Sequence, residues 1–221
     1  MATERYVYIK KGDRWNEIAM PLMVCKESID SLVCWNSKLL ASHRKGIFSA
    51  GENDSRFKMI FNGPAKQILI WEGYPVFAYG KQLMRINPNG TIEQVNYMAP
   101  YEINFLFGIK DRIYTVDNET ISGKDVCVGF NSTIYHATAC NGDIAILTDD
   151  SVLLFNPEQK NITEVFDKKT GGLEKIAACC NGIVCYDSSR IFACEEGQVR
   201  FIMPAPEGMK ITSVLLAEQA G

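Results

Sequence analysis

The chain has 221 residues, of which 47% are hydrophobic and 22% charged, and its formal net charge at pH 7 is −3. Such a composition is typical of a globular protein and excludes a disordered chain. The acidic balance gives no overall basic surface for nucleic acid, and no stretch approaches the ~20 apolar residues of a membrane-spanning helix. We therefore expect neither a nucleic-acid nor a membrane partner.

The first residues, Met-Ala-Thr-Glu-Arg-Tyr, carry an acid and are followed by no apolar run, so we expect no secretory signal. The eight cysteines should then be free, buried thiols in a reducing compartment, and the expected localisation is cytoplasmic or nuclear. Five Asn-x-Ser/Thr sequons are interpreted as turn chemistry rather than as glycosylation sites. They begin at Asn53, Asn89, Asn118, Asn131 and Asn161.

Taken in chain order, the sequence repeats a hairpin of two short strands around a polar turn. The clearest copy runs from Leu147 to Val165, with two apolar runs around Asn156-Pro157. The six copies begin at Val7, Ile47, Leu83, Ile121, Val152 and Ile191. Their spacing, roughly 31 to 40 residues, is typical of solenoids, propellers and other repeat arrays.

Between these hairpins lies a second recurring unit, in which two apolar strands are joined by a short link. Copies begin at Ile29, Ile68, Ile103, Ile134 and Leu173, and a final single strand begins at Ile211. Two copies turn on Asn141-Gly142 and Asn181-Gly182. Asn-Gly is a strong hairpin signal because both central residues of a type I′ turn need positive φ. Each repeat therefore has four short antiparallel strands, here named A to D.

Four antiparallel strands per repeat resemble the blade of a β-propeller. The predicted fold class is all-β, a six-bladed β-propeller of four-stranded antiparallel blades in a single domain, residues 1–221. The blades are expected at approximately 29–62, 68–97, 103–130, 134–166, 173–203, and 211–221 plus 5–20. The last blade would be shared between the two termini, closing the ring with three or four strands. Residues 13–21, with Trp15 and Met20-Pro21, resemble the end of a kelch blade, although the paired glycine of kelch blades is missing.

In a propeller, the D–A and B–C loops emerge on one face. The D–A loops here offer Met, Pro and Tyr, which suit adaptable or aromatic contact surfaces. The B–C loops are basic in the first two blades and acidic in the next three, at Asp117, Asp149-Asp150 and Asp187, which would orient a charged partner or simply serve turns. The candidate binding residues are Leu22, Met23, Arg44, Lys45, Tyr97, Met98, Pro100, Tyr101, Pro204 and Met209. Leu22, Tyr97, Tyr101 and Met209 are expected mid-loop; for the methionines, packing under the next blade remains an alternative.

The sequence indicates no catalytic residues, metal site or cofactor. His43 is expected in a charged loop and His136 on an A strand, too few for a triad or a multi-histidine site, and Cys179, Cys180 and Cys185 lack zinc spacing. The predicted function is a non-catalytic protein–protein interaction scaffold, a monomeric propeller within a hetero-complex.

Two alternatives stay open for this sequence. The first is a channel-centred, metal-dependent hydrolase with an ion held by inner-strand Asp30, Asn104 and Glu174. The second is a lectin-like binder, which would need equivalent pockets in every blade, whereas Trp15, Trp35 and Trp71 do not recur in the later blades.

Overall fold

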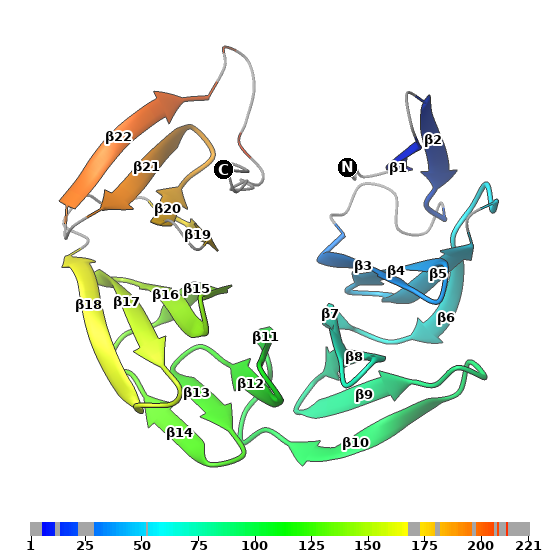
Figure 1. The fold of residues 1–221 in the computed structure, drawn as a ribbon, viewed down its shortest axis with the longest axis horizontal. Helices are drawn as coiled ribbons and strands as arrows, with labels where there is room; N and C mark the ends of the chain where they lie inside the picture. The colour runs from blue at the N-terminus through cyan, green and yellow to red at the C-terminus, as the bar shows by residue number, and fades with distance from the viewer. Residues whose placement is uncertain are drawn as a thin grey trace. The chain divides into compact units, whose positions relative to one another are not determined.

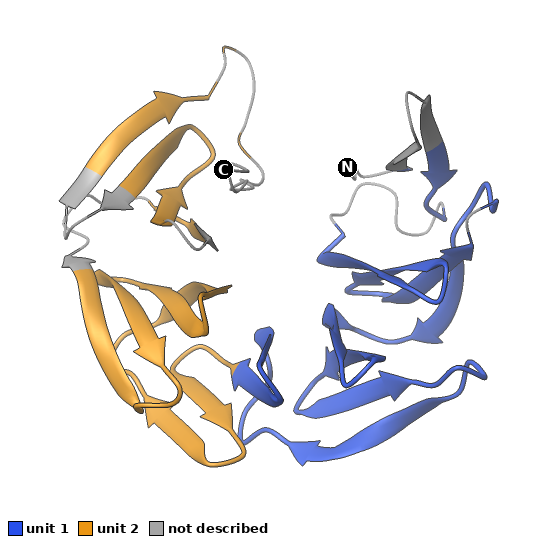
Figure 2. Ribbon diagram, viewed as in Figure 1, with its two compact units in different colours: residues 1–115 blue, residues 116–221 orange. Residues whose placement is uncertain are grey.

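The computed structural model describes residues 6–11, 14–21, 29–51, 53–167, 173–179, 182–195, 198–205, 207 and 211. These residues form strands and links (Figure 1) and contain no helix long and apolar enough to cross a membrane. They belong to two compact units, residues 1–115 and 116–221 (Figure 2). The single domain expected from the sequence stays a prediction.

Five sheets have four antiparallel strands each, arranged in chain order without a crossover (Figure 1). The first contains β3 (Ser31–Trp35), β4 (Lys38–His43), β5 (Gly46–Gly51) and β6 (Lys58–Asn62). The second contains β7 (Lys66–Trp71), β8 (Tyr74–Tyr79), β9 (Gln82–Ile86) and β10 (Ile92–Met98). The third contains β11 (Phe105–Ile109), β12 (Arg112–Val116), β13 (Thr120–Gly123) and β14 (Val126–Gly129). The fourth contains β15 (Ile134–Cys140), β16 (Asp143–Thr148), β17 (Ser151–Asn156) and β18 (Asn161–Asp167). The fifth contains β19 (Lys175–Cys179), β20 (Gly182–Tyr186), β21 (Arg190–Glu195) and β22 (Gln198–Pro204). The all-β fold with its four-stranded A–B–C–D repeat is thus confirmed.

A separate hairpin of β1 (Tyr6–Lys11) and β2 (Arg14–Ala19) precedes the first sheet. Its Val7 and Ile18 are 1% and 2% exposed and share a core cluster with Phe48 and Phe57 of the first sheet's region. The hairpin predicted at the start of the chain is therefore present. The closing strand expected at 211–217 lies, after Ile211, outside the described residues.

The middle strands of the sheets are the most deeply buried. In β16, Ile144, Ala145, Ile146 and Leu147 are all fully buried, so both faces of that strand are covered. The outer strand β6 instead alternates between exposed and half-buried residues. Continuous apolar runs belong to strands covered on both faces, and alternating runs to strands covered on one.

Neighbouring sheets within a unit share their hydrophobic core. Leu40 and Ile47 of the first sheet pack in one cluster with Phe77 of the second. In the second unit, Leu147 of the fourth sheet clusters with Ile176 of the fifth. Within a unit, these sheets thus bury apolar faces against one another, the arrangement that repeat proteins require because one repeat cannot bury its own apolar surface.

The A–B turn predicted at Asn141-Gly142 has the expected conformation, whereas Asn181 of the second predicted turn lies outside the described residues. Asn141 and Gly142 have φ of 49° and 87°, both positive as a type I′ turn requires. Asn36-Ser37, with φ of 47° and 59°, makes a similar turn without a glycine. The indole Nε1 of Trp35 donates a hydrogen bond to the carbonyl oxygen of Gly73 (2.8 Å), which lies in the A–B turn of the next sheet. Trp35 therefore ties two neighbouring sheets together.

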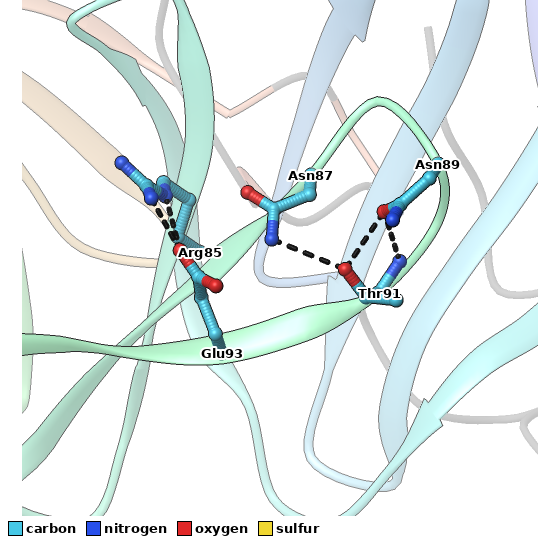
Figure 3. Close-up of polar contacts among 5 residues, drawn as sticks. All are labelled: Arg85, Asn87, Asn89, Thr91 and Glu93. Atoms are coloured by element: carbon cyan, nitrogen blue, oxygen red, sulfur yellow. Dashed lines mark hydrogen bonds and ion pairs between the residues drawn. The ribbon is translucent and has the colours of Figure 1, made fainter.

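The C–D turn between β9 and β10 is held by its own side chains (Figure 3). The Oδ1 atom of Asn89 accepts hydrogen bonds from the backbone N (3.0 Å) and Oγ1 (2.7 Å) of Thr91, and Asn87 Nδ2 donates to the same Oγ1 (3.1 Å). An Arg85–Glu93 ion pair bridges the strands beside the turn. The first and third residues of the sequon at Asn89 therefore bond to each other within the turn, in agreement with the interpretation of the sequon as turn chemistry.

Candidate binding surface

Backbone hydrogen bonds join the D–A link of a sheet to its B–C turn. In the second sheet, Ala99 N donates to Lys81 O (2.8 Å) and Ile103 N donates to Gly80 O (3.0 Å). The first sheet has the equivalent bond from Gly63 N to Lys45 O (3.1 Å). The two sets of loops therefore lie together at one end of these two sheets, and residues from both can contribute to one surface.

Several B–C turns are anchored by a side chain that accepts backbone hydrogen bonds. His43, expected in a charged loop, ends β4 and is 1% exposed; its Nδ1 accepts from Lys45 N (3.0 Å). Asp117 Oδ1 accepts from Glu119 N (2.7 Å) and Thr120 N (2.8 Å). The expectation for His43 is wrong because the end of β4 is covered, whereas the turn interpretation of Asp117 is confirmed.

Asp187 anchors the same turn in the fifth sheet. Its Oδ1 accepts from the backbone N atoms of Ser189 (2.7 Å) and Arg190 (2.8 Å), and its Oδ2 accepts from Arg190 Nη2 (2.7 Å). Burial would raise the pKa of this carboxyl, but the hydrogen bonds from Ser189 and Arg190 outweigh it and lower the pKa to about 2. Asp187 is therefore a charged structural anchor.

The candidate residues from the sequence are only partly brought together. Leu22, Met23 and Met209 lie outside the described residues. Arg44 and Lys45 are exposed in the B–C turn of the first sheet, and Pro100 and Tyr101 are exposed in the D–A link of the second. Pro204 is exposed but ends strand β22, rather than lying in a loop.

Tyr97 and Met98 both belong to β10, so the expectation that Tyr97 lies mid-loop is wrong. The strand resumes its pairing with β9 after an irregularity that follows Gln94, and at its end Met98 lies opposite Gln82. Tyr97 packs against the core cluster of the second and third sheets, and its hydroxyl shares a hydrogen bond with Thr115 Oγ1 (2.9 Å). Since neighbouring strand residues point to opposite faces, Met98 points away from that core and is 62% exposed.

Two aromatic residues that were not among the candidates lie beside these loops. The rings of Tyr79 and Phe61 meet edge to face, with centroids 5.3 Å apart. A Cβ atom at Gly63 would lie only 3.0 Å from the Tyr79 ring and 3.2 Å from that of Phe61, so a glycine is needed for the pair to close against this link. The sequence signal was available in Tyr79-Gly80-Lys81, an aromatic residue directly before a short basic turn.

Lys81 connects the aromatic pair to the D–A link. Its Nζ donates to the carbonyl oxygen of Pro100 (2.9 Å) and lies 5.9 Å from the centroid of the Tyr101 ring. Tyr79 pairs with Gln82, which in turn pairs with Met98, so the three share one face of the second sheet. We call the whole set the loop-end strip: Arg44, Lys45, Phe61, Gly63, Tyr79, Lys81, Met98, Pro100 and Tyr101.

Lys66, at the start of β7, interacts with polar groups beside the starts of the neighbouring inner strands. Lys66 Nζ donates to Asn104 Oδ1 (2.7 Å) and pairs with Glu102 (3.3 Å). Burial of its carboxyl raises the pKa of Asp30, and the positive charge of Lys66 opposes that rise, although the residue as a whole remains exposed. The ammonium group of Lys66 thus donates a hydrogen bond to Asn104 and opposes the rise in the pKa of Asp30, and these are two of the three metal ligands considered from the sequence. No group of three or more His, Cys, Asp or Glu suited to a metal occurs among the described residues.

His136, on strand β15, lacks the character of a general base poised for neutral pH. Burial lowers its pKa to about 4, and the positive charge of Lys175 adds to the lowering. The imidazole is therefore uncharged at neutral pH and holds a proton only weakly, whereas an efficient general base has a pKa near the working pH.

Comparison with known proteins finds no matching family model and no matching curated protein. Solved structures do match. The extracellular domain of BT4673 from B. thetaiotaomicron, described as a hybrid two-component system, aligns with a TM-score of 0.70 and 10% identity over 96% of this chain and 35% of its own. A chain of the mitotic checkpoint complex aligns with a TM-score of 0.62 and 12% identity over 93% of this chain and 76% of its own. The N-terminal domain of Nup159 aligns with a TM-score of 0.56 and 9% identity over 79% of this chain and 60% of its own.

These neighbours have β-propeller-like folds, and at such low identity the likeness concerns the fold alone. It supports a propeller architecture for the repeated four-stranded sheets. The chain spans about a third of the length of the bacterial extracellular domain that it matches. The kelch-like ending of residues 13–21 stays a prediction.

Proposed function

We propose that this chain is a non-catalytic protein–protein interaction scaffold, a cytoplasmic or nuclear subunit of a larger assembly, that binds a partner segment at the loop ends of its sheets. The observation that carries the proposal is the loop-end strip, in which Met98 and Tyr101 are 62% and 56% exposed beside the basic turns. Aromatic residues, methionine and arginine are enriched at protein–protein interfaces. At the inner strands, in contrast, the ammonium group of Lys66 bonds Asn104 and its charge acts on the carboxyl of Asp30.

We further propose that the chain forms a single six-bladed propeller, residues 1–221, in which the last blade is shared between the termini. Ile103 N donates to Gly80 O and Ile134 N donates to Asn118 O (2.6 Å), each just before or at the first strand of the next sheet. Ile211 N makes the equivalent bond to Ser188 O (2.9 Å) in the fifth sheet. Ile211 therefore holds the place where the A strand of a sixth blade would begin, and β1 and β2 would supply its C and D strands.

The experiment is partner capture with a loop-end variant. Met98→Glu combined with Tyr101→Glu should leave the melting temperature nearly unchanged, because exposed substitutions usually change stability by less than ~0.5 kcal/mol. The variant should nevertheless lose the proteins recovered by the wild type in an affinity capture analysed by mass spectrometry. The control is Ile162→Glu, which places one negative charge on another exposed apolar residue, 41% exposed on β18.

The reverse result is equally clear. If Met98→Glu with Tyr101→Glu recovers the same proteins as the wild type while Ile162→Glu loses them, the loop ends are not the binding surface. A variant that unfolds would instead place Met98 and Tyr101 in the core, contrary to their exposure.

A further inference from the structure

The loop ends of the first unit carry a positive charge that opposes the sign of the whole chain. The B–C turns of the first two sheets contain Arg44, Lys45 and Lys81, all exposed, and neither turn contains a carboxylate. The nearby acid in the D–A link, Glu102, pairs with Lys66. The net charge of the chain is nevertheless −3, so these cations form a local basic region on an acidic protein.

The cations lie along a continuous series of contacts with the apolar members of the loop-end strip. Lys45 O accepts from Gly63 N, and Gly63 lies against the rings of Phe61 and Tyr79. Tyr79 is separated from Lys81 by one residue, and the ammonium group of Lys81 lies over the ring of Tyr101. The strip thus offers positive charge at Arg44 and Lys45, aromatic surface at its centre, and positive charge again at Lys81.

We propose that the loop-end strip binds an acidic segment of a partner protein that carries apolar or aromatic anchor residues. This inference rests on the proposed interaction function and specifies the chemistry of the partner. The carboxylates of the segment would lie against Arg44, Lys45 and Lys81, and its anchors would pack against Tyr79, Met98 and Tyr101. Complementary charge steers encounter and sets specificity, while buried aromatic contacts supply most of the affinity.

A protein segment fits this surface better than a nucleic acid does. Three exposed cations would neutralise only about three phosphates, fewer than the six to ten contacts of a typical DNA-binding protein. The acidic character of the rest of the chain would also repel a polyanion. Met98 and the edge of Tyr79 suit side-chain anchors, and each carboxylate of a short segment can find a cation along the strip.

The test uses a fluorescein-labelled peptide of three Glu-Asp-Leu-Tyr repeats and fluorescence anisotropy with the full-length chain. The acidic peptide should bind more tightly than a matched peptide of Lys-Arg-Leu-Tyr repeats, and also more tightly than one of Glu-Asp-Ser-Gly repeats, which lacks the anchors. Arg44→Glu with Lys45→Glu should weaken binding ~10-fold or more, and Tyr101→Ala should weaken it by a similar factor. Raising the salt concentration to about 0.3 M should weaken binding of the acidic peptide, because salt screens the charge-dependent part of its affinity.

The matched control is Lys38→Glu with Lys58→Glu, two exposed lysines at the opposite end of the first sheet. This variant makes the same change in net charge and should bind the acidic peptide as the wild type does. A methyl resonance of Met98 should shift on addition of the peptide, whereas that of Met59, which packs on a core cluster, should stay in place.

Three results would overturn the inference. The first is equal binding of the acidic and the basic peptides, and the second is equal weakening of peptide binding by the Arg44/Lys45 variant and by the Lys38/Lys58 control. The third is tighter binding of a single-stranded oligonucleotide, in a manner that depends on Arg44 and Lys45. Partner capture distinguishes this failure from that of the proposed function. If Met98→Glu with Tyr101→Glu loses its partner but the acidic peptide is not preferred, the surface is a binding site for another chemistry and only this inference is wrong.

Discussion

Asp187 illustrates how single polar residues hold the loop ends in place. It is 7% exposed and accepts five hydrogen bonds from Ser189 and Arg190. Asp117 does the same in the third sheet, and the hydroxyl of Thr148 accepts from Ser151 N (3.1 Å) in the fourth. Short polar side chains that accept backbone hydrogen bonds are common turn anchors, so these residues position the loops.

The Asp187 turn should make stability depend on pH in acid. The folded pKa of about 2 lies below the ordinary value of 3.8, so the carboxylate stabilises the fold above pH 4 and loses that effect as the pH falls to 2. Asp187→Asn keeps an acceptor but removes the charge, and should cost about 2 kcal/mol at neutral pH. Urea denaturation from pH 7 to pH 2 should show the two proteins converging.

The matched variant is Asp150→Asn, an exposed acid in the equivalent turn of the fourth sheet. It should change the free energy of unfolding by less than ~0.5 kcal/mol at any of these pH values. A difference between Asp187→Asn and the wild type that persists undiminished at pH 2 would contradict the assignment of the charge effect to Asp187.

Trp35 gives a second residue-scale prediction. Trp35→Phe keeps most of the ring but removes the Nε1 donor that bonds Gly73 O, so it should lower the free energy of unfolding by about 1 kcal/mol. Trp71→Phe should cost less, because its bond to Asp111 O is longer, at 3.4 Å. Chemical denaturation measures both. A larger loss in Trp71→Phe would mean that ring packing, and not the hydrogen bond, decides the effect.

At the scale of elements, β22 differs from the other outer strands. Phe201, Ile202 and Met203 are 52%, 49% and 46% exposed in succession on the last strand of the fifth sheet. The run spans a bulge of the kind also found in β6 and β18, since Ile191 pairs with Met203 and Phe192 with Phe201, leaving Ile202 as the extra residue. Exposed apolar residues on an edge strand favour association with other strands.

We therefore expect Ile202→Lys to reduce aggregation at high protein concentration, because a charge on an edge strand opposes strand addition. Its melting temperature should stay nearly that of the wild type. Light scattering during slow heating measures the onset of aggregation. Ile162→Lys provides the control, since Ile162 is exposed on β18 between polar neighbours and should have little effect. Equal behaviour of the two variants would show that the β22 run has no special role.

At the scale of the whole molecule, the proposed closure of the repeat concerns the hairpin at the start of the chain. The described sheets stack through shared cores within each unit, so the loss of one sheet exposes apolar surface on the next. The hairpin β1–β2 has two strands where the five complete sheets have four. A sixth blade completed from the other end of the chain would remove this difference and leave no open edges.

Removal of residues 211–221 should therefore lower the melting temperature by at least about 5 °C, which for a chain of this size corresponds to roughly 1–2 kcal/mol. Removal of residues 218–221, beyond the expected A strand, should have little effect and serves as the control. Differential scanning calorimetry measures both truncations. An unchanged melting temperature in the longer truncation would mean that the C-terminal segment does not complete a blade.

The sequence by itself determined the strands, their order and several turns of this protein. Apolar runs of strand length recur at a regular spacing, and Asn141-Gly142 needs the conformation that only a few turn types provide. These are local signals, because strand length, alternation and turn geometry depend on residues close together in the chain. That is why the four-stranded repeat was predictable without any tertiary contact.

The tertiary structure alone decided which loop residues are available for binding. Tyr97 and Tyr101 look alike in sequence, yet one packs beside Thr115 and the other is exposed. His43 resembles a surface histidine until β4 is covered, and Tyr79 becomes a candidate only when Gly63 brings it against Phe61. The physical reason is that burial depends on contacts between sheets some 20 to 40 residues apart, and the pairing of side chains across that separation cannot be deduced from local pattern.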